Sequence, residues 1–268
     1  MDKALRSGAD GLILDLEDSV EAVNKPAARE RVALFLTHRS SATNVLVRIN
    51  AIDSDFLAED LSMVASARPD GIVLPKAEGA VSVRKITGRL AALNAPSFPL
   101  LPIATETPRA IFRLAEYEHV TNDLLALTWG AEDLPAYIGA KGSRLSNGAL
   151  RPPYEMVRAL TLFAAHAAGV DAIETVYPDF RDLEGLRAYA DRGAFDGFAG
   201  MMAIHPTQVP VINACFTPSS AEIEDAHRVI DAFAAGVGVV NLDGKMLDAP
   251  HLKSAHRLLA RIASPKKN

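Results

Sequence analysis

Charged or polar side chains follow almost every short apolar run of this sequence, and reaction sites are built from such patterns. In chain order, the residues that follow the runs are Asp15, Glu17, Asp18, Arg48, Lys76, Glu106, Glu132, Asp133 and His205. A single residue of this kind is readily explained as a helix cap or a turn residue. Their recurrence after successive runs instead indicates one shared site.

The set is rich in carboxylates and contains one arginine and one lysine. Mg²⁺ takes one or two protein carboxylates and keeps its other positions for water and substrate, and Glu106 and Asp133 could supply such a pair. Arg48 could bind an anionic substrate or a developing oxyanion through its planar fork of donors. Lys76 could form a Schiff base only if it were desolvated, and the surrounding acids favour its protonated form.

The apolar runs themselves have the composition of buried strands. They cover residues 12–14, 45–47, 71–75, 99–105, 124–129, 171–177 and 197–204. The runs are continuous rather than alternating, as expected of parallel strands that are covered on both faces. The segments between them predict helices over residues 25–38, 79–93 and 153–168. Most strands would then start roughly 25–35 residues apart, which is the spacing of βα units.

This repeat predicts an α/β fold, a barrel of the TIM (β/α)₈ type that lacks its first strand. Seven runs are present where the closed barrel needs eight, and residues 2–8 read as a helix with no strand before it. A doubly wound open sheet also uses βα units, but no glycine-rich dinucleotide fingerprint follows any run. In a barrel the carboxyl ends of the strands meet at one face, which would bring the polar residues together.

The pattern changes near residue 215. Residues 217–236 predict one helix capped by Ser219 or Ser220, and a turn around Asp243 and Gly244 leads to a closing helix. We therefore expect a catalytic barrel domain over residues 1–215 and a C-terminal helical extension, or lid, over residues 216–268. Such an extension needs a surface against which to bury its apolar helix face, and this predicts a homo-oligomer.

Composition excludes several classes of protein. Hydrophobic residues make up 49% and charged residues 23% of the 268 residues, the balance of a globular protein rather than a disordered one. The net charge of −5 offers no basic surface for nucleic acid, and the single Cys215 excludes an internal disulfide framework. No apolar run approaches the roughly 18 residues of a membrane span, and the N-terminus lacks a signal-peptide core. We therefore expect a cytoplasmic protein.

Seven stretches follow one another along nearly the whole chain. They are GADGLILDLEDSV (8–20), VRIN (47–50), GIVLPK (71–76), ATETP (104–108), WGAEDL (129–134), AIHPTQV (203–209) and DGKMLDAPH (243–251). Together they resemble the HpcH/HpaI aldolase and citrate lyase β-subunit family, most closely its malyl-CoA and citramalyl-CoA lyases. The resemblance implies a TIM barrel, a Mg²⁺ cofactor, a trimer or hexamer, and cleavage or formation of a carbon–carbon bond next to a CoA thioester.

The resemblance also implies roles for single residues. Glu106 and Asp133 match the metal ligands, and Arg48 matches the arginine that binds the substrate carboxylate and the forming enolate. Asp248 matches an acid on the C-terminal lid that shuttles a proton, often into a neighbouring subunit's site. The expected catalytic residues are Arg48, Glu106 and Asp248, the expected substrate contacts are Arg48, Lys76, Glu106, Glu132, Ile204 and His205, and the expected acids behind the metal are Asp15, Glu17 and Asp18.

Family members begin with a further strand, whose loop helps to hold the CoA phosphates. No such strand precedes residues 2–8 in this sequence. We therefore expect the strands at residues 12–14 and 197–204 to flank a gap. The same gap predicts weak binding of CoA.

The predicted function is a Mg²⁺-dependent carbon–carbon lyase. It would cleave or form a 3-hydroxyacyl-CoA such as citramalyl-CoA or malyl-CoA, with acetyl-CoA or a homologue and a 2-oxoacid as products. Two other enzymes remain open, a thioesterase for the same thioesters and an aldolase that acts on a 2-oxoacid without CoA. The alternative that is not an enzyme is a catalytically silent assembly or binding subunit.

Overall fold

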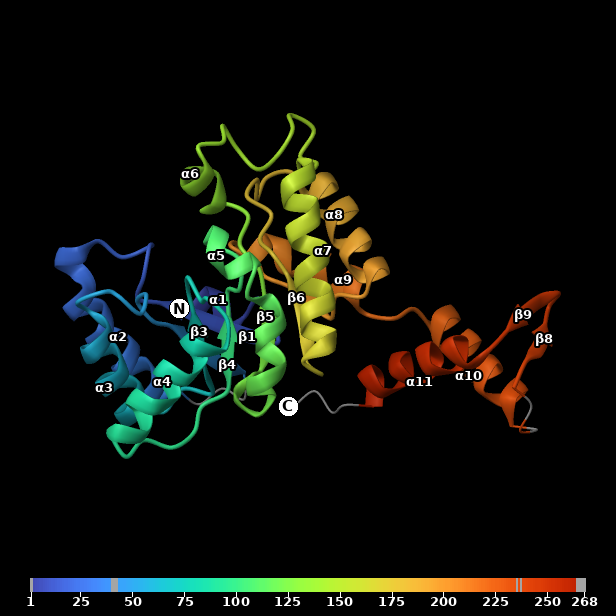
Figure 1. The fold of residues 1–268 in the computed structure, drawn as a ribbon, viewed down its shortest axis with the longest axis horizontal. Coiled ribbons are helices and arrows are strands. Elements are labelled where there is room, and N and C mark those ends of the chain that lie inside the picture. The colour runs from blue at the N-terminus through green and yellow to red at the C-terminus, as the bar shows by residue number, and fades with distance from the viewer. Residues whose placement is uncertain (1, 40–42, 235, 237, 264–268) are drawn as a thin grey trace. The chain divides into compact units, whose positions relative to one another are not determined.

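The computed structural model describes residues 2–39, 43–234, 236 and 238–263. The chain divides into two compact units, Met1–Asn213 and Ala214–Asn268, and each is described by itself. Figure 1 colours the first unit from blue to orange and the second in orange and red.

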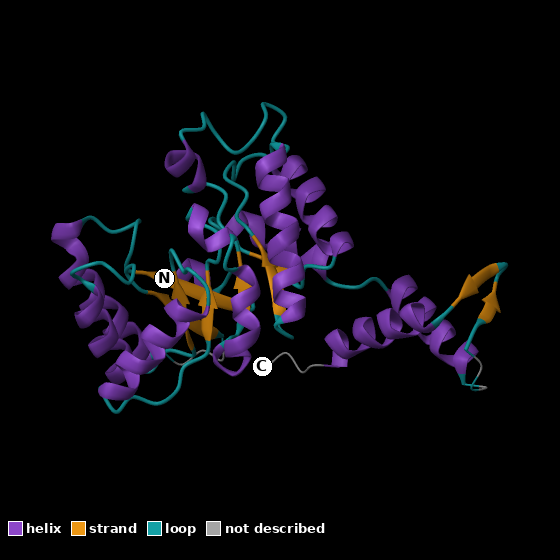
Figure 2. Ribbon diagram, viewed as in Figure 1, coloured by secondary structure: helices purple, strands orange, loops and turns teal. Residues whose placement is uncertain are grey.

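Seven parallel strands form the centre of the first unit (Figure 2). They are β1 (Gly11–Asp15), β2 (Asn44–Arg48), β3 (Gly71–Leu74), β4 (Leu100–Pro102), β5 (Ala126–Thr128), β6 (Asp171–Glu174) and β7 (Gly200–Met201). One sheet has the order β1-β2-β3-β4 and another β5-β6-β7. Parallel bridges from Leu100 to Leu124 and from Ile103 to Thr128 join the neighbourhood of β4 to that of β5. The strands therefore lie side by side in chain order, each at the position of a predicted run.

Helices precede, connect and follow the strands. They are α1 (Asp2–Leu5), α2 (Lys25–His38), α3 (Leu57–Ala67), α4 (Ala80–Ala92), α5 (Pro108–Ile111), α6 (Leu134–Ile138), α7 (Pro152–Ala167), α8 (Leu183–Asp196), α9 (Val209–Phe216) and the 3₁₀ segments η1 (Ala22–Asn24), η2 (Leu114–Asp123) and η3 (Pro206–Gln208). α2 packs on α3, α3 on α4, α4 on η2 and η2 on α7. These helices are therefore neighbours in the same order as the strands that they follow, and Figure 1 shows them around the strands.

The strands from β2 to β5 are buried on both faces, which explains their continuous apolar runs, whereas exposed and buried residues alternate along β1. Leu46, Val73, Leu101, Ile103 and Ala126 form one cluster, and Ile173 packs against it. These residues come from β2, β3, β4, β5 and β6 or from directly after them, so they share one face of the strands. Their strand neighbours are also buried and belong to the opposite face, because side chains alternate along a strand.

The closed eight-stranded barrel is not formed by the strands that the structure describes. β1 and β7 are each the edge of a sheet. The segment ahead of β1 is helical, as predicted, but its helix ends at Leu5 rather than at residue 8. The observed architecture is therefore an α/β fold with seven parallel strands in chain order, each near its predicted place.

The second unit contains two helices and a hairpin. They are α10 (Ser220–Phe233), β8 (Val240–Leu242), β9 (Lys245–Leu247) and α11 (Ala249–Ala263). Ser219 caps α10 in a capping box with Glu222. Asp243 and Gly244 both have positive φ, as a two-residue hairpin turn requires. Ala226, Val229, Leu247 and Ala255 form the core of this unit. Within the described residues, no helix is both long and apolar enough to cross a membrane.

Candidate active site

Asp15 and Arg48 begin the site at the ends of two neighbouring strands. The register of β1 and β2 places them opposite each other. Arg48 Nε donates to Asp15 Oδ1 at 2.7 Å and Nη2 donates to Oδ2 at 2.6 Å. The same carboxylate accepts the main-chain N–H groups of Glu17 at 2.9 Å and Ser19 at 3.1 Å. Burial acts to raise the pKa of Asp15, but the bonds and charge of Arg48 outweigh it and lower that pKa to about 2.

Glu17 links this pair to the next strand. Its buried carboxylate forms an ion pair with Lys76 Nζ, and Arg48 Nη1 lies 3.3 Å from its Oε2. Asp18 Oδ2 lies 3.5 Å from the same Lys76 ammonium. Burial raises the pKa of Glu17 although both cations act to lower it. Burial would lower the pKa of Arg48 and of Lys76, but their hydrogen bonds to Asp15 and Glu17 outweigh it and raise both.

The backbone of Lys76 continues the chain of contacts to the fourth strand. Lys76 follows β3 and has φ 50°, a left-handed conformation that is uncommon for a residue with a side chain. This conformation points its N–H to Glu106 Oε2, at 2.5 Å. Strained backbone of this kind persists where surrounding contacts hold it in place. Here the Glu17 ion pair at one end and the Glu106 bond at the other supply those contacts.

Glu106 and Asp133 bring two carboxyl groups together. Burial raises the pKa of Glu106 to about 8, and the hydrogen bond and charge of Asp133 raise it further against the opposing effect of Lys76. Gly130 makes room for this arrangement, because a Cβ there would lie 2.8 Å from Glu106 Cγ and 3.3 Å from Ile103 Cγ2. A buried carboxyl beside another carboxyl is stable when ionised only if positive charge is added.

The donor set at this point suits a divalent cation with few protein ligands. Glu106 and Asp133 offer carboxylate oxygens, which Mg²⁺ prefers, and Mg²⁺ is held by one or two carboxylates while keeping several waters. Within the described part of the chain, no group of three or more His, Cys, Asp or Glu side chains is placed to hold a metal. The residues therefore fit a metal that shares its remaining positions with water and substrate, not one enclosed by protein.

A buried network supports the loop that carries Asp133. Trp129 Nε1, four residues earlier, donates to Glu174 Oε1 at 2.7 Å. Glu174 is fully buried at the end of β6 and also accepts from Arg158 Nε at 2.6 Å and from Tyr189 OH at 3.1 Å. All these groups are within hydrogen-bonding distance of a partner, so the network holds the start of the loop in one position.

Three of the expected site residues lie apart from these contacts. Glu132 is exposed, 3.5 Å from Ser143 Oγ, and so does not share the contacts of its neighbour Asp133. Ile204 and His205 are also exposed. His205 caps η3, its Nδ1 accepting the N–H of Thr207, and its ring stacks on Phe180 with centroids 4.8 Å apart.

Asp248 belongs to the second unit. It is exposed at the start of α11, and its Oδ1 lies 2.6 Å from His251 Nδ1. The residue that Asp248 contacts, His251, belongs to the same unit. The role expected of Asp248 therefore remains a prediction from the sequence.

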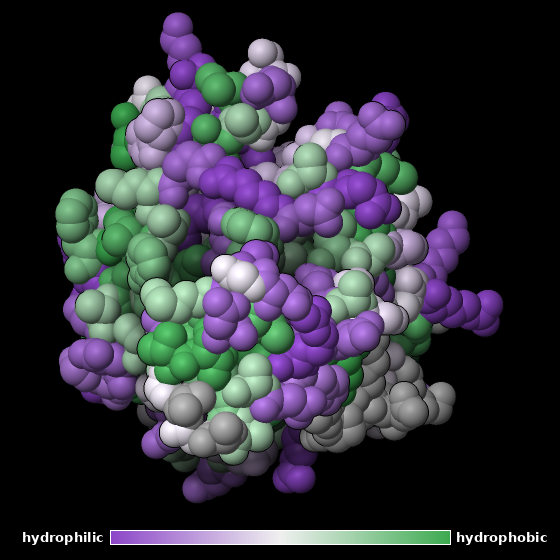
Figure 3. Space-filling model, turned by 90° about the vertical axis from the view of Figure 1, so that its right-hand side faces the viewer, coloured by the Kyte–Doolittle hydropathy of each residue, from purple (hydrophilic) through white to green (hydrophobic). Residues whose placement is uncertain are grey.

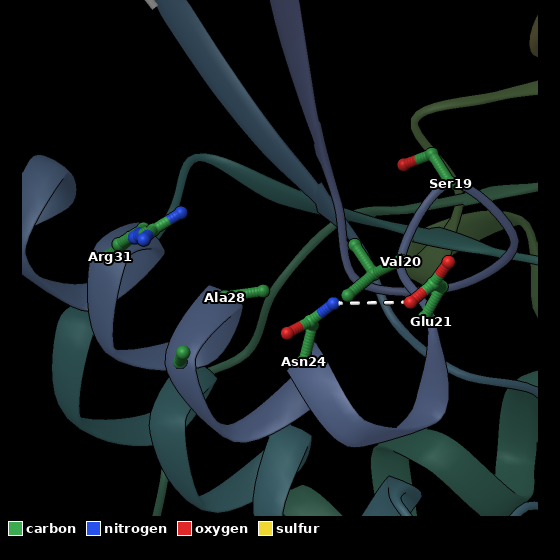
Figure 4. Close-up of a pocket in the computed structure, with 7 residues that line it drawn as sticks. Ser19, Val20, Glu21, Asn24, Ala28 and Arg31 are labelled. Carbon is green, nitrogen blue, oxygen red and sulfur yellow. Dashed lines mark hydrogen bonds between the residues drawn. The ribbon is translucent and has the colours of Figure 1, made fainter.

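The residues that directly follow Asp18 in the chain line a surface cavity of about 460 Å³. It is lined by residues between Ser19 and Arg31, where the loop after β1 meets the first turns of α2 (Figure 4). Asn24 Nδ2 donates to Glu21 Oε2 at 3.4 Å across it. None of the expected catalytic or metal-binding residues lines this cavity.

Sequence reasoning missed two supports of the site. Lys25 is buried behind Glu17, although it was expected only as the first residue of a helix. A cation at a helix N-terminus opposes the helix dipole, and this conflict is the one signal that could have indicated it. The left-handed backbone at Lys76 left no sequence signal, because glycine, the usual residue for that conformation, is absent.

Comparison with known proteins identifies relatives along almost the whole chain. Residues 1–206 match the model of the family described as HpcH/HpaI aldolase/citrate lyase. A citrate lyase subunit beta-like protein of Mycobacterium tuberculosis (strain H37Rv) is 37% identical over 95% of this chain and 88% of its own length. A (3S)-malyl-CoA thioesterase of Cereibacter sphaeroides (strain KD131) is 35% identical over 97% of this chain and 89% of its own.

The fold has matches among solved structures. The crystal structure of the protein CitE from Mycobacterium tuberculosis, in complex with magnesium, acetoacetate and coenzyme A, superposes with a TM-score of 0.83. It is 34% identical, and the match covers 97% of this chain and 92% of that one.

Proposed function

The chain belongs to the HpcH/HpaI aldolase/citrate lyase family, and from this premise we propose that it is a Mg²⁺-dependent carbon–carbon lyase. Its substrate would be a 3-hydroxyacyl-CoA thioester such as malyl-CoA or citramalyl-CoA. Cleavage would give acetyl-CoA, or a homologue, and a 2-oxoacid. The observation that carries the proposal is the buried Glu106 carboxyl beside Asp133, joined to Arg48 and Lys76 by continuous contacts.

Glu106 and Asp133 would hold the Mg²⁺. Bound there, the ion would act as a Lewis acid toward the hydroxyl and carboxylate oxygens of the substrate. The N–H of Lys76 fixes one oxygen of Glu106, and Gly130 leaves the space in which that carboxylate lies. These two contacts orient Glu106 before any ligand is bound, which lowers the cost of ordering it later.

Arg48 would bind negative charge of the substrate and of the fragments that form from it. Asp15 holds Nε and Nη2 of the guanidinium, so that Nη1 and the remaining face stay directed toward Glu17 and the end of β3. A planar cation held in this way recognises a carboxylate or an enolate oxygen better than a free one does. Lys76 adds a second positive charge, because Glu17 and Asp18 keep its ammonium protonated.

Asp248 would exchange the proton at the carbon that leaves as the methyl group of acetyl-CoA. In cleavage it would protonate the thioester enolate, and in condensation it would remove a methyl proton. An Asp248→Asn variant should therefore fail to exchange acetyl-CoA methyl protons with deuterated water. Such exchange is followed by mass spectrometry without a need for turnover.

The decisive experiment incubates the protein with Mg²⁺ and either malyl-CoA or citramalyl-CoA. A lyase releases glyoxylate or pyruvate together with acetyl-CoA and yields no free thiol. Formation of the 2-oxoacid, its loss on adding EDTA and its loss in Glu106→Gln would support the proposal. Absence of any 2-oxoacid from both substrates would refute it.

A thioesterase is the second candidate, because a relative of 35% identity is named (3S)-malyl-CoA thioesterase. Hydrolysis would involve the same residues, but water would attack the thioester carbon and the carbon–sulfur bond would break instead of the carbon–carbon bond. The incubation above distinguishes the two reactions. A thioesterase releases free CoA, measured with a thiol reagent, and leaves the hydroxy acid intact.

A further inference from the structure

We propose that Lys25 is a positioning residue that holds the ends of β1 and β2 so that Glu17 and Arg48 face each other. The inference deepens the proposed function and rests on it for its catalytic consequence. It starts from a buried ammonium that the mechanism above leaves unused. Lys25 is the first residue of α2, and it is 8% exposed.

The three donors of the Lys25 ammonium have three acceptors. Nζ lies 2.8 Å from Leu16 O, 3.0 Å from Glu17 O and 2.6 Å from Asn50 Oδ1. The ring of Phe56 lies beneath it, with Nζ 5.4 Å from the centroid. The first two acceptors belong to the segment directly after β1, and the third lies two residues beyond Arg48 on the segment after β2.

Asn50 extends this anchor to a third element. Its Nδ2 donates to Leu16 O at 3.0 Å and to Asp60 Oδ2 at 2.6 Å, and its own N–H donates to the same Asp60 oxygen at 2.9 Å. Asp60 is fully buried on α3 and pairs with Arg29 at 2.9 Å. The two strand ends are therefore tied to each other and to the helices behind them.

Stability alone does not account for a lysine at this position. None of the ion pairs among the described residues includes Lys25, so its buried charge has only uncharged oxygens as direct partners. Removing a charge from water is costly, and at the first turn of a helix the dipole opposes a cation as well. An apolar side chain would avoid both costs. Leu16 O would keep Asn50 Nδ2 as a donor and Glu17 O would keep the N–H of Val20, so among the described bonds only Asn50 Oδ1 would lose its donor.

The position of those oxygens indicates what Lys25 does. Glu17 has its main-chain oxygen held by Lys25 while its carboxylate faces Lys76 and Arg48. Without the ammonium, the segment after β1 keeps the bonds of Leu16 N–H to Arg48 O and of Asn50 Nδ2 to Leu16 O, but it loses its hydrogen bonds to the side chain of α2. Glu17 is then held less firmly against the two cations. Arg48 would then keep Asp15 but lose the second acid that sets its orientation.

The test uses Lys25→Met, which keeps an unbranched apolar side chain and removes all three donors. Lys85→Met is the matched control, since Lys85 is exposed on α4. Amide hydrogen exchange by mass spectrometry should be about tenfold faster in residues 14–20 and 48–52 of Lys25→Met and unchanged in β4–β6. In the lyase assay kcat should fall about 10–100-fold, as for other supports of a site, while KM changes less than about threefold.

The two measurements, hydrogen exchange and kcat, distinguish a failure of this inference from a failure of the proposed function. If the wild-type protein shows no lyase activity, the proposed function fails and hydrogen exchange alone decides whether Lys25 holds the two strand ends. Unchanged exchange in residues 14–20 and 48–52, or faster exchange with normal kcat, would overturn the inference. Should Lys25→Met not fold, Lys25→Ala removes the same three donors from a smaller side chain, and the same two measurements apply with the same outcomes.

Discussion

Arg48 donates two hydrogen bonds to one carboxylate, and this geometry limits what can replace it. Lysine has a single ammonium and cannot reproduce the fork of donors that meets Asp15 at 2.7 and 2.6 Å. We predict that Arg48→Lys lowers kcat/KM of the lyase reaction by at least about a hundredfold. Steady-state assays with Mg²⁺ would measure it, with Arg89→Lys on the exposed side of α4 as the control. Near-normal turnover would remove Arg48 from the mechanism.

Glu106 should make the metal site sensitive to pH. Its pKa is raised to about 8, so the carboxyl carries a proton at neutral pH when no cation is bound. A cation must displace that proton, and the apparent Kd for Mg²⁺ should rise about tenfold for each pH unit below 8. Calorimetric titration between pH 6 and 9 would measure the slope, and Glu106→Gln should abolish it. An affinity that stays constant over this range would contradict the prediction.

The Glu106 carboxyl also makes the free energy of unfolding of the metal-free protein depend on pH. Because the pKa is higher in the folded protein than its usual 4.5, the folded state binds the proton more tightly. Its contribution is therefore most favourable below pH 4.5 and declines as the pH rises to about 8. Mg²⁺ should offset that decline at alkaline pH, so thermal unfolding with and without the ion should diverge as the pH rises.

At the scale of elements, the loop after β5 depends on a glycine. A Cβ at residue 130 would meet Glu106 Cγ at 2.8 Å, whereas nothing lies within 4 Å of a Cβ at Gly88 in α4. We predict that Gly130→Ala displaces Glu106 and weakens Mg²⁺ binding about tenfold or more, as loss of a support of a metal site does. Gly88→Ala should instead stabilise the protein by about 0.5–1 kcal/mol, because alanine is the better helix former. Calorimetry and urea unfolding would measure the two effects, and equal metal affinity in both variants would refute the prediction.

The contact of α7 with β6 depends on a buried ion pair. Arg158 Nε lies 2.6 Å from Glu174 Oε2, and both side chains are almost completely buried. Removing the cation leaves a buried carboxylate without its charge partner, so we predict that Arg158→Met lowers the free energy of unfolding by about 3–5 kcal/mol. Adding Glu174→Gln to it should recover part of the loss, since the unpaired charge is then gone. Urea denaturation would measure both, and a single variant as stable as the wild type would show that the pair contributes nothing.

At the scale of the whole molecule, exposed apolar side chains favour self-association. Met156, Leu160 and Phe163 are 56, 39 and 68% exposed and share one face of α7 through their spacing. Hydrophobic residues also reach the surface among hydrophilic ones in the view of Figure 3. Contiguous apolar surface on a protein usually marks an interaction site. We predict a homo-oligomer, a trimer or a hexamer, in light scattering at micromolar concentration, and a monomer under those conditions would contradict it.

The sequence by itself determined the order of the elements and the identity of the strand-end residues. Continuous apolar runs predicted the seven strands because strands covered on both faces must be apolar on both, and the Asp243–Gly244 turn predicted the hairpin through its backbone requirements. Helix ends were less predictable. Ser219 caps α10 as predicted, because the local capping box sets where that helix begins, whereas the helix α9 over Val209–Phe216 was not predicted.

Only the tertiary structure decided which of the candidate residues touch. The register of β1 and β2 sets Asp15 against Arg48, and the left-handed backbone of Lys76 turns its N–H to Glu106. Neither Glu132 nor His205 joins them, although both follow strands in the same way. Sequence spacing specifies the strand end at which a residue stands, whereas register, backbone dihedrals and the buried bonds of groups such as Lys25 specify where its side chain lies. Those depend on contacts between segments far apart in the chain, which no local pattern encodes.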